Sequence, residues 1–460
     1  MNNIMFLARL LVLFSLVCIS CAHSSFEQKQ LKHALDFATS NRLELEILLQ
    51  HYTYDSLKLE AAKFLIRNMP HCYSYQQGGE MDSVKRVRTY YSPFGQIDQT
   101  YARRWGHYTY RNLPKIYDAH IITAEYLIDN IDRAFDNWQK RPWNRSLSFE
   151  DFCEYLLPYR IGDEPLEEWR ELYEKKYGYL LDSIYKGSDV VEAANLVSRH
   201  LQEPVFIYCE DFELPHIGPR YLFSHRYGSC VDAADIVTYA FRAVGIPCME
   251  DTDARGGHVW NVVRDTTGRD VPIWYIASEA VRGSRDTGGY KRGKVYRPMY
   301  GFQEEKAAHL GDDWKSMPLL FYHPYMKDVS YAYYPDTLRI LTGIPDDEVC
   351  YLAHFHEAHW WSCACARSAS GKMEIPNLES ELVYLPMKYT KGNYYPSGFP
   401  FWFAGGEINT FLPDWEKTVK VRLYRKYPVY GWLRSFMSHV VGGTFEGSMT
   451  KDFEDGKRLY

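Results

Sequence analysis

The chain has few of the closely spaced cysteines that metal-binding and redox proteins use. It contains ten cysteines in 460 residues, but no Cys-x-x-Cys pair, and only one residue separates Cys363 from Cys365. This spacing excludes a structural zinc knuckle and a thioredoxin-type redox pair. The sequence also has no acidic loop of the calcium-binding kind. We therefore expect neither a metal ion nor a cofactor.

One histidine-rich segment leaves zinc as an alternative. His354, His356 and His359 lie close together and shortly before Cys363. The segment lacks the His-Glu-x-x-His signature of a helical zinc site and falls where strands are expected. We interpret it as a plain exposed hairpin and the tryptophan pair after it as packing between sheets. Binding of zinc and stacking on a sugar are the alternatives.

An excess of charge of one sign is also missing. The formal net charge is −6 and the isoelectric point lies near 6.3, which gives no reason to predict a nucleic-acid partner. One short basic run, Lys85-Arg86-Val87-Arg88, is interpreted as a solvated edge strand or loop. There are no repeats or low-complexity tracts, and the length is sufficient for roughly two to four domains.

Long apolar runs are scarce, and the main one lies at the amino terminus. Residues 10–17 are almost entirely apolar and follow Arg9, but they are too few to span a bilayer as a mature helix. We therefore predict a signal peptide over residues 1–20. A serine directly precedes Cys21 and a Ser-rich stretch follows, which resembles the lipobox of bacterial lipoproteins, although Cys18 stands where leucine is usual.

The lipobox resemblance implies cleavage before Cys21 and attachment of lipid to its sulfur and to the new amino terminus. Acyl chains would then tether the exported protein to a bacterial membrane, on its periplasmic or cell-surface side. The membrane is thus an expected partner through the lipid anchor, while the folded part stays in water. An ordinary signal peptide that is cut nearby is the alternative.

Residues 21–145 are expected to form a helical region. Apolar side chains recur at helical spacing over residues 26–69. One stripe consists of Leu43, Ile47 and Leu48, and a second consists of Leu57, Ala61, Phe64 and Leu65. Further helices are predicted over residues 119–138 and 190–201.

The carboxy-terminal part changes to the period-two pattern of β-strands. We expect a β-sandwich of immunoglobulin-like size over residues 320–437, as a separate domain. Residues 438–460 resemble the opening of a discoidin-like β-sandwich, and because such modules often bind carbohydrate, a glycan becomes an alternative partner. The strands predicted most clearly are residues 349–355, 382–387 and 419–423.

Cys230 is predicted to open a helix. From this residue onward apolar side chains recur every three or four positions, and Gly245 followed by Pro247 marks the end. Amide groups and the positive end of the dipole at the first turn favour a thiolate, the form of cysteine that attacks acyl carbon atoms. Gly228 and Ser229 allow a tight turn that lets the sulfur face a cleft. The alternative is a small buried cysteine.

A thiolate nucleophile needs a base, and histidine is the usual choice because its pKa lies near neutrality. His258 begins a segment of alternating character. Residues 265–268 are predicted to form the turn of a hairpin whose second strand covers residues 271–276. We expect His258 and Cys230 to share one solvent-accessible groove.

These two segments resemble the catalytic core of the transglutaminase-like superfamily, a group of papain-like cysteine acyl-transferases and hydrolases. The resemblance covers a small part of the chain: Gly-Ser-Cys at 228–230 with a helix ending in Ala-Val-Gly-Ile-Pro, then Gly-His-Val-Trp-Asn at 257–261. It implies an α+β fold with a papain-like core over residues 146–310. It also implies Cys230 as the nucleophile and His258 as the general base.

The third catalytic residue of that family is an aspartate four positions after a tryptophan on the next strand, whereas here Trp274 leads to Ser278. This group orients the imidazole and stabilises its cation, and a hydroxyl contributes little to the second task. Glu279 is predicted by strand alternation to face the other side. By strand alternation Asp270 faces the same side as Ser278, but it lies close to the turn. We rank Ser278 first, Glu279 second and Asp270 third.

The expected function is attack by Cys230 on amide bonds of a protein or peptide substrate. The reaction passes through a thioester and ends in hydrolysis or acyl transfer. Because Ser278 stands where the family has aspartate, the alternative is a catalytically inactive surface lipoprotein that binds a glycan or a protein.

Overall fold

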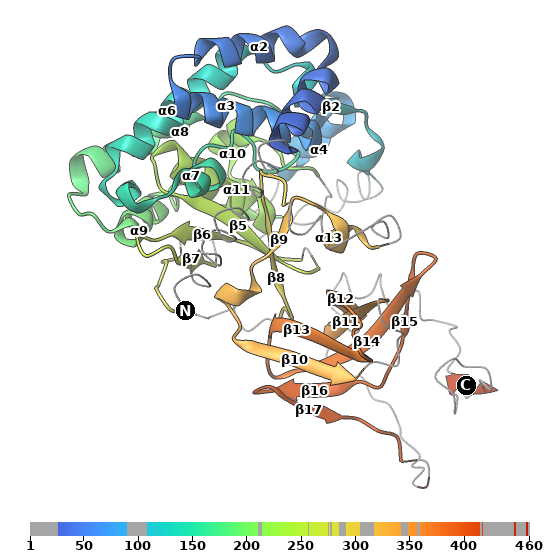
Figure 1. Cartoon of the computed structure of the whole chain (residues 1–460). Helices are drawn as coiled ribbons and strands as arrows, with labels where there is room; N and C mark the ends of the chain where they lie inside the picture. The colour runs from blue at the N-terminus through green and yellow to red at the C-terminus, as the bar shows by residue number, and fades with distance from the viewer. Residues whose placement is uncertain are drawn as a thin grey trace, which may run out of the picture. The chain divides into compact units, whose positions relative to one another are not determined.

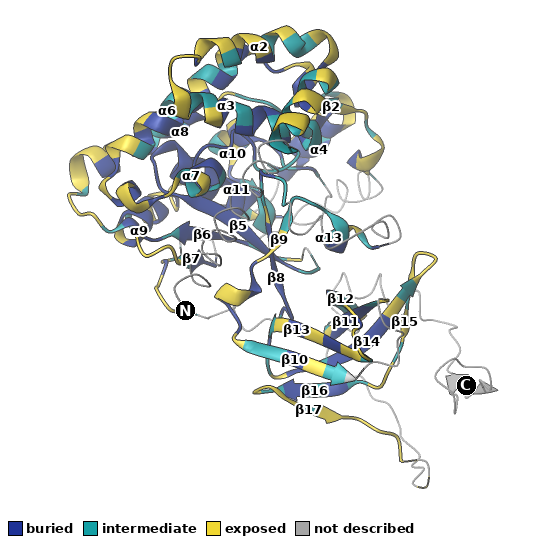
Figure 2. Ribbon diagram, in the orientation of Figure 1, coloured by how far each residue is buried: buried dark blue, intermediate teal, exposed yellow. Residues whose placement is uncertain are grey.

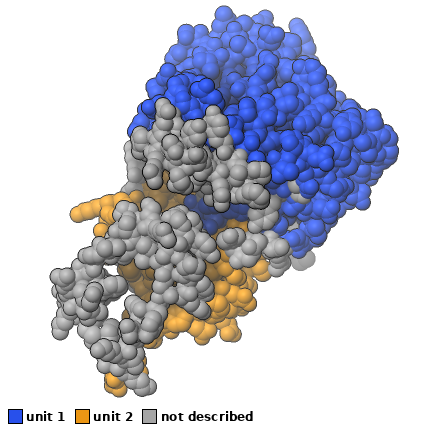
Figure 3. All heavy atoms as spheres, turned by 180° about the vertical axis from the view of Figure 1, so that it is seen from behind, with its two compact units in different colours: residues 1–290, 295–311, 322–332 blue, residues 291–294, 312–321, 333–460 orange. Residues whose placement is uncertain are grey.

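The described part of the chain is a mixture of helices and β-sheets (Figure 1), which confirms the predicted α+β class at this coarse level. It divides into two compact units (Figure 3). Unit 1 comprises residues 1–290, 295–311 and 322–332, and unit 2 comprises residues 291–294, 312–321 and 333–460. The computed structural model describes residues 26–89, 108–209, 214–255, 257–274, 276, 278–284, 291–303, 317–341, 348–356, 359–414, 416, 446–447 and 457–458.

The predicted ranges compare with these units as follows: 21–145 and most of 146–310 fall in unit 1, and most of 320–437 falls in unit 2. The predicted boundaries themselves stay predictions. Residues 1–25, with Cys21, and all of 438–460 except two short strands lie outside the described residues. Among the helices that the structure describes, none is long and apolar enough to cross a membrane.

Helices make up most of the amino-terminal part of unit 1 (Figure 1). The first covers residues 26–37. The others are α2 (Arg42–His51), α3 (Ser56–Asn68), α4 (Gly79–Arg88), α6 (Ala124–Lys140), α7 (Phe149–Tyr155), α8 (Arg170–Tyr179), α9 (Val190–His200), α10 (Pro219–His225) and α11 (Cys230–Ala243), with α13 (Leu319–Tyr322) later in the chain and short turns η1 (Thr39–Asn41), η2 (Met69–His71), η3 (Tyr110–Asn112), η4 (Asp118–His120), η5 (Pro142–Ser146), η6 (Leu180–Ile184) and η8 (Ser330–Ala332).

Two of these helices match local signals in the sequence. The helix predicted over residues 190–201 is confirmed as α9, and its cap is Asp189, whose carboxylate accepts from the N–H of Val191 at 2.8 Å. The helix predicted over residues 119–138 begins later, at Ala124, because the Thr123 side chain caps it. Short-range capping chemistry therefore sets both helix starts.

The apolar stripe predicted through Leu43, Ile47 and Leu48 is confirmed only at Leu48. Leu43 and Ile47 are 64% and 41% exposed, whereas Leu45 and Leu48 are 0% exposed. Figure 2 shows the alternation of buried and exposed positions along α2. The sequence offers two apolar faces on this helix, and the buried one is the face that packs in a common core with α3, α6 and α7. In the second predicted stripe Leu57 is 42% exposed, whereas Ala61, Phe64 and Leu65 are buried as predicted.

The sheet of unit 1 has five strands in the order β7-β6-β5-β8-β9, and every neighbouring pair is antiparallel. The predicted hairpin is present as β6 and β7, with Gly268 at φ +77° in its turn. The strands of unit 1 are β1 (Tyr73–Tyr75), β2 (Lys115–Tyr117), β3 (Ile207–Tyr208), β4 (Tyr227–Gly228), β5 (Cys248–Asp253), β6 (Val259–Arg264), β7 (Asp270–Ile273), β8 (Val295–Pro298) and β9 (Met326–Asp328).

Helix α11 packs between this sheet and the helices α8 and α9 in one apolar core. Every residue from 232 to 243 is buried. Two side chains bind the carbonyl groups that follow the helix: Nε of Arg141, which lies between α6 and η5, donates to Val244 at 2.8 Å, and Nε1 of Trp143 in η5 donates to Gly245 at 2.9 Å. Gly245 has φ +81°. The carboxy-terminal end of α11 is thus held by these hydrogen bonds, which helps to fix the position of the first turn of the helix.

The described part of unit 2 is mainly β-strands. A six-stranded antiparallel sheet has the order β12-β11-β14-β16-β17 with β15 paired to β14, and β10 pairs with β13. The strands predicted at 349–355 and 382–387 are confirmed as β11 and β14, while 419–423 lies outside the described residues. The strands are β10 (Asp336–Leu341), β11 (Val349–His356), β12 (His359–Arg367), β13 (Lys372–Leu378), β14 (Leu382–Thr390), β15 (Asn393–Pro396), β16 (Phe401–Ala404), β17 (Glu407–Thr410), β18 (Glu446–Gly447) and β19 (Lys457–Arg458).

Candidate active site

Cys230 is the first residue of α11, and it is half-buried. A capping box closes the helix start: the Ser229 hydroxyl accepts from the N–H of Asp232, and the Asp232 carboxylate accepts from the N–H of Ser229 at 2.7 Å. This position favours a thiolate, as the sequence predicts.

Arg88 neutralises the carboxylate in that capping box. Its Nη1 lies 3.0 Å from Oδ2 of Asp232, and the two side chains are 3% and 5% exposed. An unpaired carboxylate in the same helical turn would disfavour a second negative charge on Cys230. The arginine therefore removes an opposing charge from the neighbourhood of the sulfur as well as holding the turn in place.

The interpretation of residues 85–88 as a solvated edge strand or loop is wrong. They form the last turn of α4. Lys85 is 9% exposed and Arg88 is 3% exposed, on the same helix face as Met81 and Val84, which are 0% exposed. Lys85 Nζ donates to Gln77 Oε1 at 2.7 Å. A run of basic residues can be buried in this way when each cation has a specific acceptor.

Gly228 lies against the same carboxylate. It belongs to β4, which pairs in parallel with β3, and a Cβ at this position would lie 2.3 Å from Cβ and Oδ2 of Asp232. Only glycine permits this approach. The small residue before Ser229 and Cys230 is therefore required by packing, in addition to the tight turn that the sequence predicts.

Gly228→Ala is expected to lower the free energy of unfolding by about 1–3 kcal/mol, because the new methyl group must displace Asp232. Chemical denaturation measures this change. Gly178→Ala in α8 is the control, since its Cβ would meet nothing closer than 3.6 Å. That variant should be neutral or stabilised by about 0.5–1 kcal/mol. An equal effect in both variants would contradict the close approach.

His258 directly precedes β6 and is half-buried. Its carbonyl accepts from Thr252 Oγ1 at 3.1 Å and from the N–H of Asp253 at 3.3 Å. The Asp253 carboxylate accepts from the N–H groups of Arg255 at 3.1 Å and Gly257 at 2.9 Å. Its other oxygen lies 2.9 Å from Nη2 of Arg255. These bonds position the backbone that carries the imidazole.

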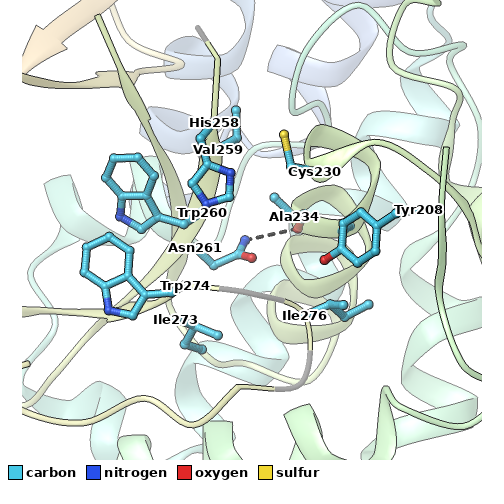
Figure 4. Close-up of a pocket in the computed structure, with 11 residues that line it drawn as sticks. Tyr208, Cys230, Ala234, His258, Val259, Trp260, Asn261, Ile273, Trp274 and Ile276 are labelled. Atoms are coloured by element: carbon cyan, nitrogen blue, oxygen red, sulfur yellow. Dashed lines mark hydrogen bonds between the residues drawn. The ribbon is translucent and has the colours of Figure 1, made fainter. Parts of the chain in front are cut away.

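Cys230 and His258 line the same pocket (Figure 4). The thiol comes from the start of α11 and the imidazole from the start of β6, and the two side chains border the pocket from these two sides. The pocket is partly open to solvent, and its cavity volume is small, about 10 Å³, which is roughly the room that one water molecule needs. The described residues that line it are Tyr208, Cys230, Ala233, Ala234, His258, Val259, Trp260, Asn261, Ile273, Trp274 and Ile276.

Asn261 joins the two elements that supply the thiol and the imidazole. From β6 its Nδ2 donates to the Ala234 carbonyl of α11 at 3.0 Å (Figure 4) and to Thr238 Oγ1 at 2.9 Å. All three residues are buried. These bonds fix the register between strand and helix, so Asn261 is a positioning residue.

None of the three candidates for the third catalytic group lines this pocket within the described residues. Strand β7 ends at Ile273, so strand alternation does not extend to Ser278 or Glu279 as expected. The Ser278 carbonyl accepts from Ser198 Oγ at 3.1 Å, and Glu279 pairs with Arg199 at 3.0 Å near the surface.

Asp270 belongs to a buried ion-pair cluster instead. Its Oδ2 lies 2.8 Å from Nη1 of Arg297, and its Oδ1 lies 3.1 Å from Nη1 of Arg264. The Tyr155 hydroxyl donates to the same carboxylate at 3.0 Å. This cluster links the outer strand of the sheet to β8 and α7, and it gives Asp270 a structural role in place of a catalytic one.

The histidine-rich segment forms the predicted hairpin, in which His356 of β11 pairs with His359 of β12. His354 is 0% exposed, so the segment is not wholly exposed as predicted. Over the described residues, no group of three or more histidine, cysteine, aspartate or glutamate side chains could hold a metal ion.

Asp232, Arg88, Asp253 and Asn261 are the positioning residues that sequence reasoning missed. A signal was present for Asp232, because Ser229-x-x-Asp232 has the spacing of a capping box. Asp253 precedes the glycine pair of its loop, where aspartate commonly accepts backbone N–H bonds. No local signal identifies Arg88, whose partner lies 144 residues away.

Comparisons with known protein families, with curated proteins and with solved structures find no match to this chain.

Proposed function

We propose that the protein is a cysteine-dependent enzyme that acts on amide bonds of proteins or peptides through a thioester. The observation that carries the proposal is the joint lining of one solvent-open pocket by Cys230 and His258. The thiol lies at a helix start that favours its ionised form, and histidine is the base that suits a cysteine nucleophile near neutral pH.

In the proposed reaction the Cys230 thiolate attacks the amide carbonyl carbon and forms a C–S bond. The tetrahedral intermediate collapses when the C–N bond breaks, and the amine leaves with a proton from protonated His258. A water molecule or an acceptor amine then loses its proton to His258 and attacks the thioester. This step releases the acyl product and restores the thiolate.

Backbone N–H groups at the start of α11 are the proposed donors to the oxyanion of the tetrahedral intermediate. They suit this task because they belong to the first turn of a helix whose far end is anchored. The geometry of that turn is set by the capping box of Ser229 and Asp232.

The resemblance to the transglutaminase-like superfamily supports the same proposal for the fold. We interpret α11 with the antiparallel sheet of unit 1 as a papain-like core, since a cysteine that opens a helix and a histidine on a neighbouring strand are its defining parts. The sheets of unit 2 are proposed to form a β-sandwich. Export and lipid attachment at Cys21 also remain proposals and concern residues outside the described ranges.

One observation favours the alternative function of a catalytically inactive lipoprotein that binds a glycan or a protein. Within the described residues, Ser278, Glu279 and Asp270 do not line the pocket that Cys230 and His258 share. Lack of that group costs an enzyme of this kind much of its rate. The two functions differ in whether the thiol is activated.

Iodoacetamide at pH 7 is expected to alkylate Cys230 at least about tenfold faster than Cys365, because a thiolate reacts and a thiol does not. Both side chains are half-buried, which makes Cys365 a matched internal control. Burial raises the pKa of Cys72 and Cys248 to about 12 and that of Cys350 to about 11, so these thiols should stay unlabelled.

Peptide mapping by mass spectrometry reads each site separately in that experiment. Equal rates at Cys230 and Cys365 would remove the support for an activated nucleophile and favour the binding function.

A further inference from the structure

The carboxylate of Asp235 on α11 is paired with a histidine. Asp235 is 0% exposed, and its two oxygens lie 3.0 and 2.9 Å from Nδ1 of His216. Among the side chains that the structure describes, no other forms a hydrogen bond or an ion pair with this carboxylate. An unpaired carboxylate at this depth is strongly unfavourable. Asp235 therefore depends on the proton that it shares with His216.

The imidazole of His216 is held in place by the segment that precedes α8. The N–H of His216 donates to Asp163 Oδ1 at 2.9 Å, and the ring lies against Gly162, where an added Cβ would be 2.3 Å from Nε2. The side chain is 23% exposed. Water can therefore exchange a proton with the ring while Nδ1 stays on Asp235.

The charged groups around this pair include two more buried carboxylates. Glu164 is 3% exposed and lies 3.7 Å from Arg160, and Glu250 of β5 is 7% exposed and accepts from Thr238 Oγ1 at 2.7 Å. Burial alone lowers the pKa of His216, but Asp235, Asp163 and Glu164 together raise it well above its usual value. The pair therefore keeps a proton at neutral pH. The described titratable and charged groups that face it are Lys85 of α4, Arg160, Asp163 and Glu164 before α8, Tyr173 of α8, Asp232, Tyr239 and Arg242 of α11, and Glu250 of β5.

The pair lies on the helix that carries Cys230. Asp235 follows Cys230 by little more than one turn, about 7.5 Å along the helix axis. The first buried carboxylate after the thiol, Asp232, is neutralised by Arg88, and the second is neutralised by His216. Arginine stays charged at any physiological pH, whereas histidine gains and loses its proton in this range. Of the two carboxylates, only Asp235 therefore has a partner whose charge changes with pH.

We infer that His216 and Asp235 form a pH-dependent switch, which holds the start of α11 in place and the Cys230 thiol reactive for as long as the pair keeps its proton. When this proton passes to water at higher pH, the helix retains a buried carboxylate without a counter-charge, which destabilises the fold and disfavours a thiolate nearby. The stability that the pair provides is fully present below about 6.5, the pKa of an ordinary histidine, and is lost as the pH rises through the raised pKa of His216. The effect on the thiol rests on the proposed function, whereas the effect on stability does not.

Histidine NMR of the full chain tests the switch, with His216 identified by the signal that His216→Gln removes. In wild type the imidazole should titrate above about 6.5, and in Asp235→Asn it should titrate below this value, because burial then acts without the counter-charge. Denaturation should show that wild type loses stability relative to Asp235→Asn as the pH rises above about 6.5. A wild-type His216 that titrates at or below about 6.5 would overturn the inference, whether or not Asp235→Asn folds.

His225→Gln is the control for both measurements. His225 is exposed, and its Nδ1 lies 3.2 Å from the Tyr221 carbonyl oxygen. This variant should follow the pH dependence of wild type. If it flattened that dependence as Asp235→Asn does, the loss of stability would not belong to the pair and the switch would be refuted.

Alkylation of Cys230 by iodoacetamide at about pH 8 measures the effect on the thiol. His216→Gln should slow this reaction at least about threefold, because the Asp235 carboxylate is left without its counter-charge. Combining His216→Gln with Asp235→Asn should restore most of the rate, since no buried charge remains. A double variant as slow as His216→Gln would show that the histidine acts through packing, which overturns the switch.

The same labelling distinguishes failure of the switch from failure of the proposed function. If Cys230 of wild type reacts faster than Cys365 but His216→Gln leaves its rate unchanged, the switch fails at the thiol and the proposed function stands. If Cys230 of wild type reacts no faster than Cys365, the proposed function and the effect on the thiol fail together. A raised His216 pKa with pH-dependent stability would then support only the structural half of the switch.

Discussion

Cys230→Ala is expected to reduce amide turnover by about four orders of magnitude or more, because removal of a nucleophile leaves only the contribution of substrate binding and oxyanion donors. The fold should be retained. The side chain is half-buried at the first position of α11, and alanine is well tolerated in helices. We expect a change in the free energy of unfolding within about 0.5 kcal/mol.

The measurement compares wild type, Cys230→Ala and Cys365→Ala on a panel of peptide and glutamine amides. Cys365→Ala is the matched control, because it removes another half-buried thiol from unit 2. His258→Ala should lose about as much activity as Cys230→Ala. The double variant should be no less active than either single variant, since the two groups act as a unit. Equal turnover by wild type and Cys230→Ala would favour the binding function.

Local signals predicted much of the architecture around Cys230. The start of α11 follows from helical periodicity and from glycine and serine before the cysteine, and the hairpin of β6 and β7 follows from alternation around a turn with Gly268. These features depend on residues close together in the chain. For the same reason the Asp189 cap of α9 was predictable.

Features that depend on distant partners were not predictable in this way. Helix α2 has apolar residues on two faces, and only its packing shows that Leu45 is buried while Leu43 is exposed. Strand alternation allows Asp270 to face the same side as a catalytic residue, but its carboxylate forms ion pairs with Arg297 and Arg264 instead. Strand alternation predicts that Ser278 and Glu279 face opposite sides, but β7 ends at Ile273, so the pattern does not reach them. A single sequence records none of these contacts.

The ion pair of Arg88 and Asp232 is the long-range contact with the largest expected effect. Arg88→Met is expected to lower the free energy of unfolding by about 3–5 kcal/mol, because it leaves the buried Asp232 carboxylate without its counter-charge. It should also slow alkylation of Cys230 at pH 7, since an uncompensated negative charge raises the pKa of a neighbouring thiol. Denaturant titration and peptide mapping measure the two effects.

The double variant Arg88→Met with Asp232→Asn separates this charge effect from loss of packing. Removing both charges should cost less than Arg88→Met alone, because no buried ion is left unpaired. Arg86→Met is the control, since Arg86 is exposed on the same helix, and it should change stability by less than about 0.5 kcal/mol. If the double variant were less stable than Arg88→Met, the arginine would act through packing, and its electrostatic support of the Cys230 thiolate would be refuted.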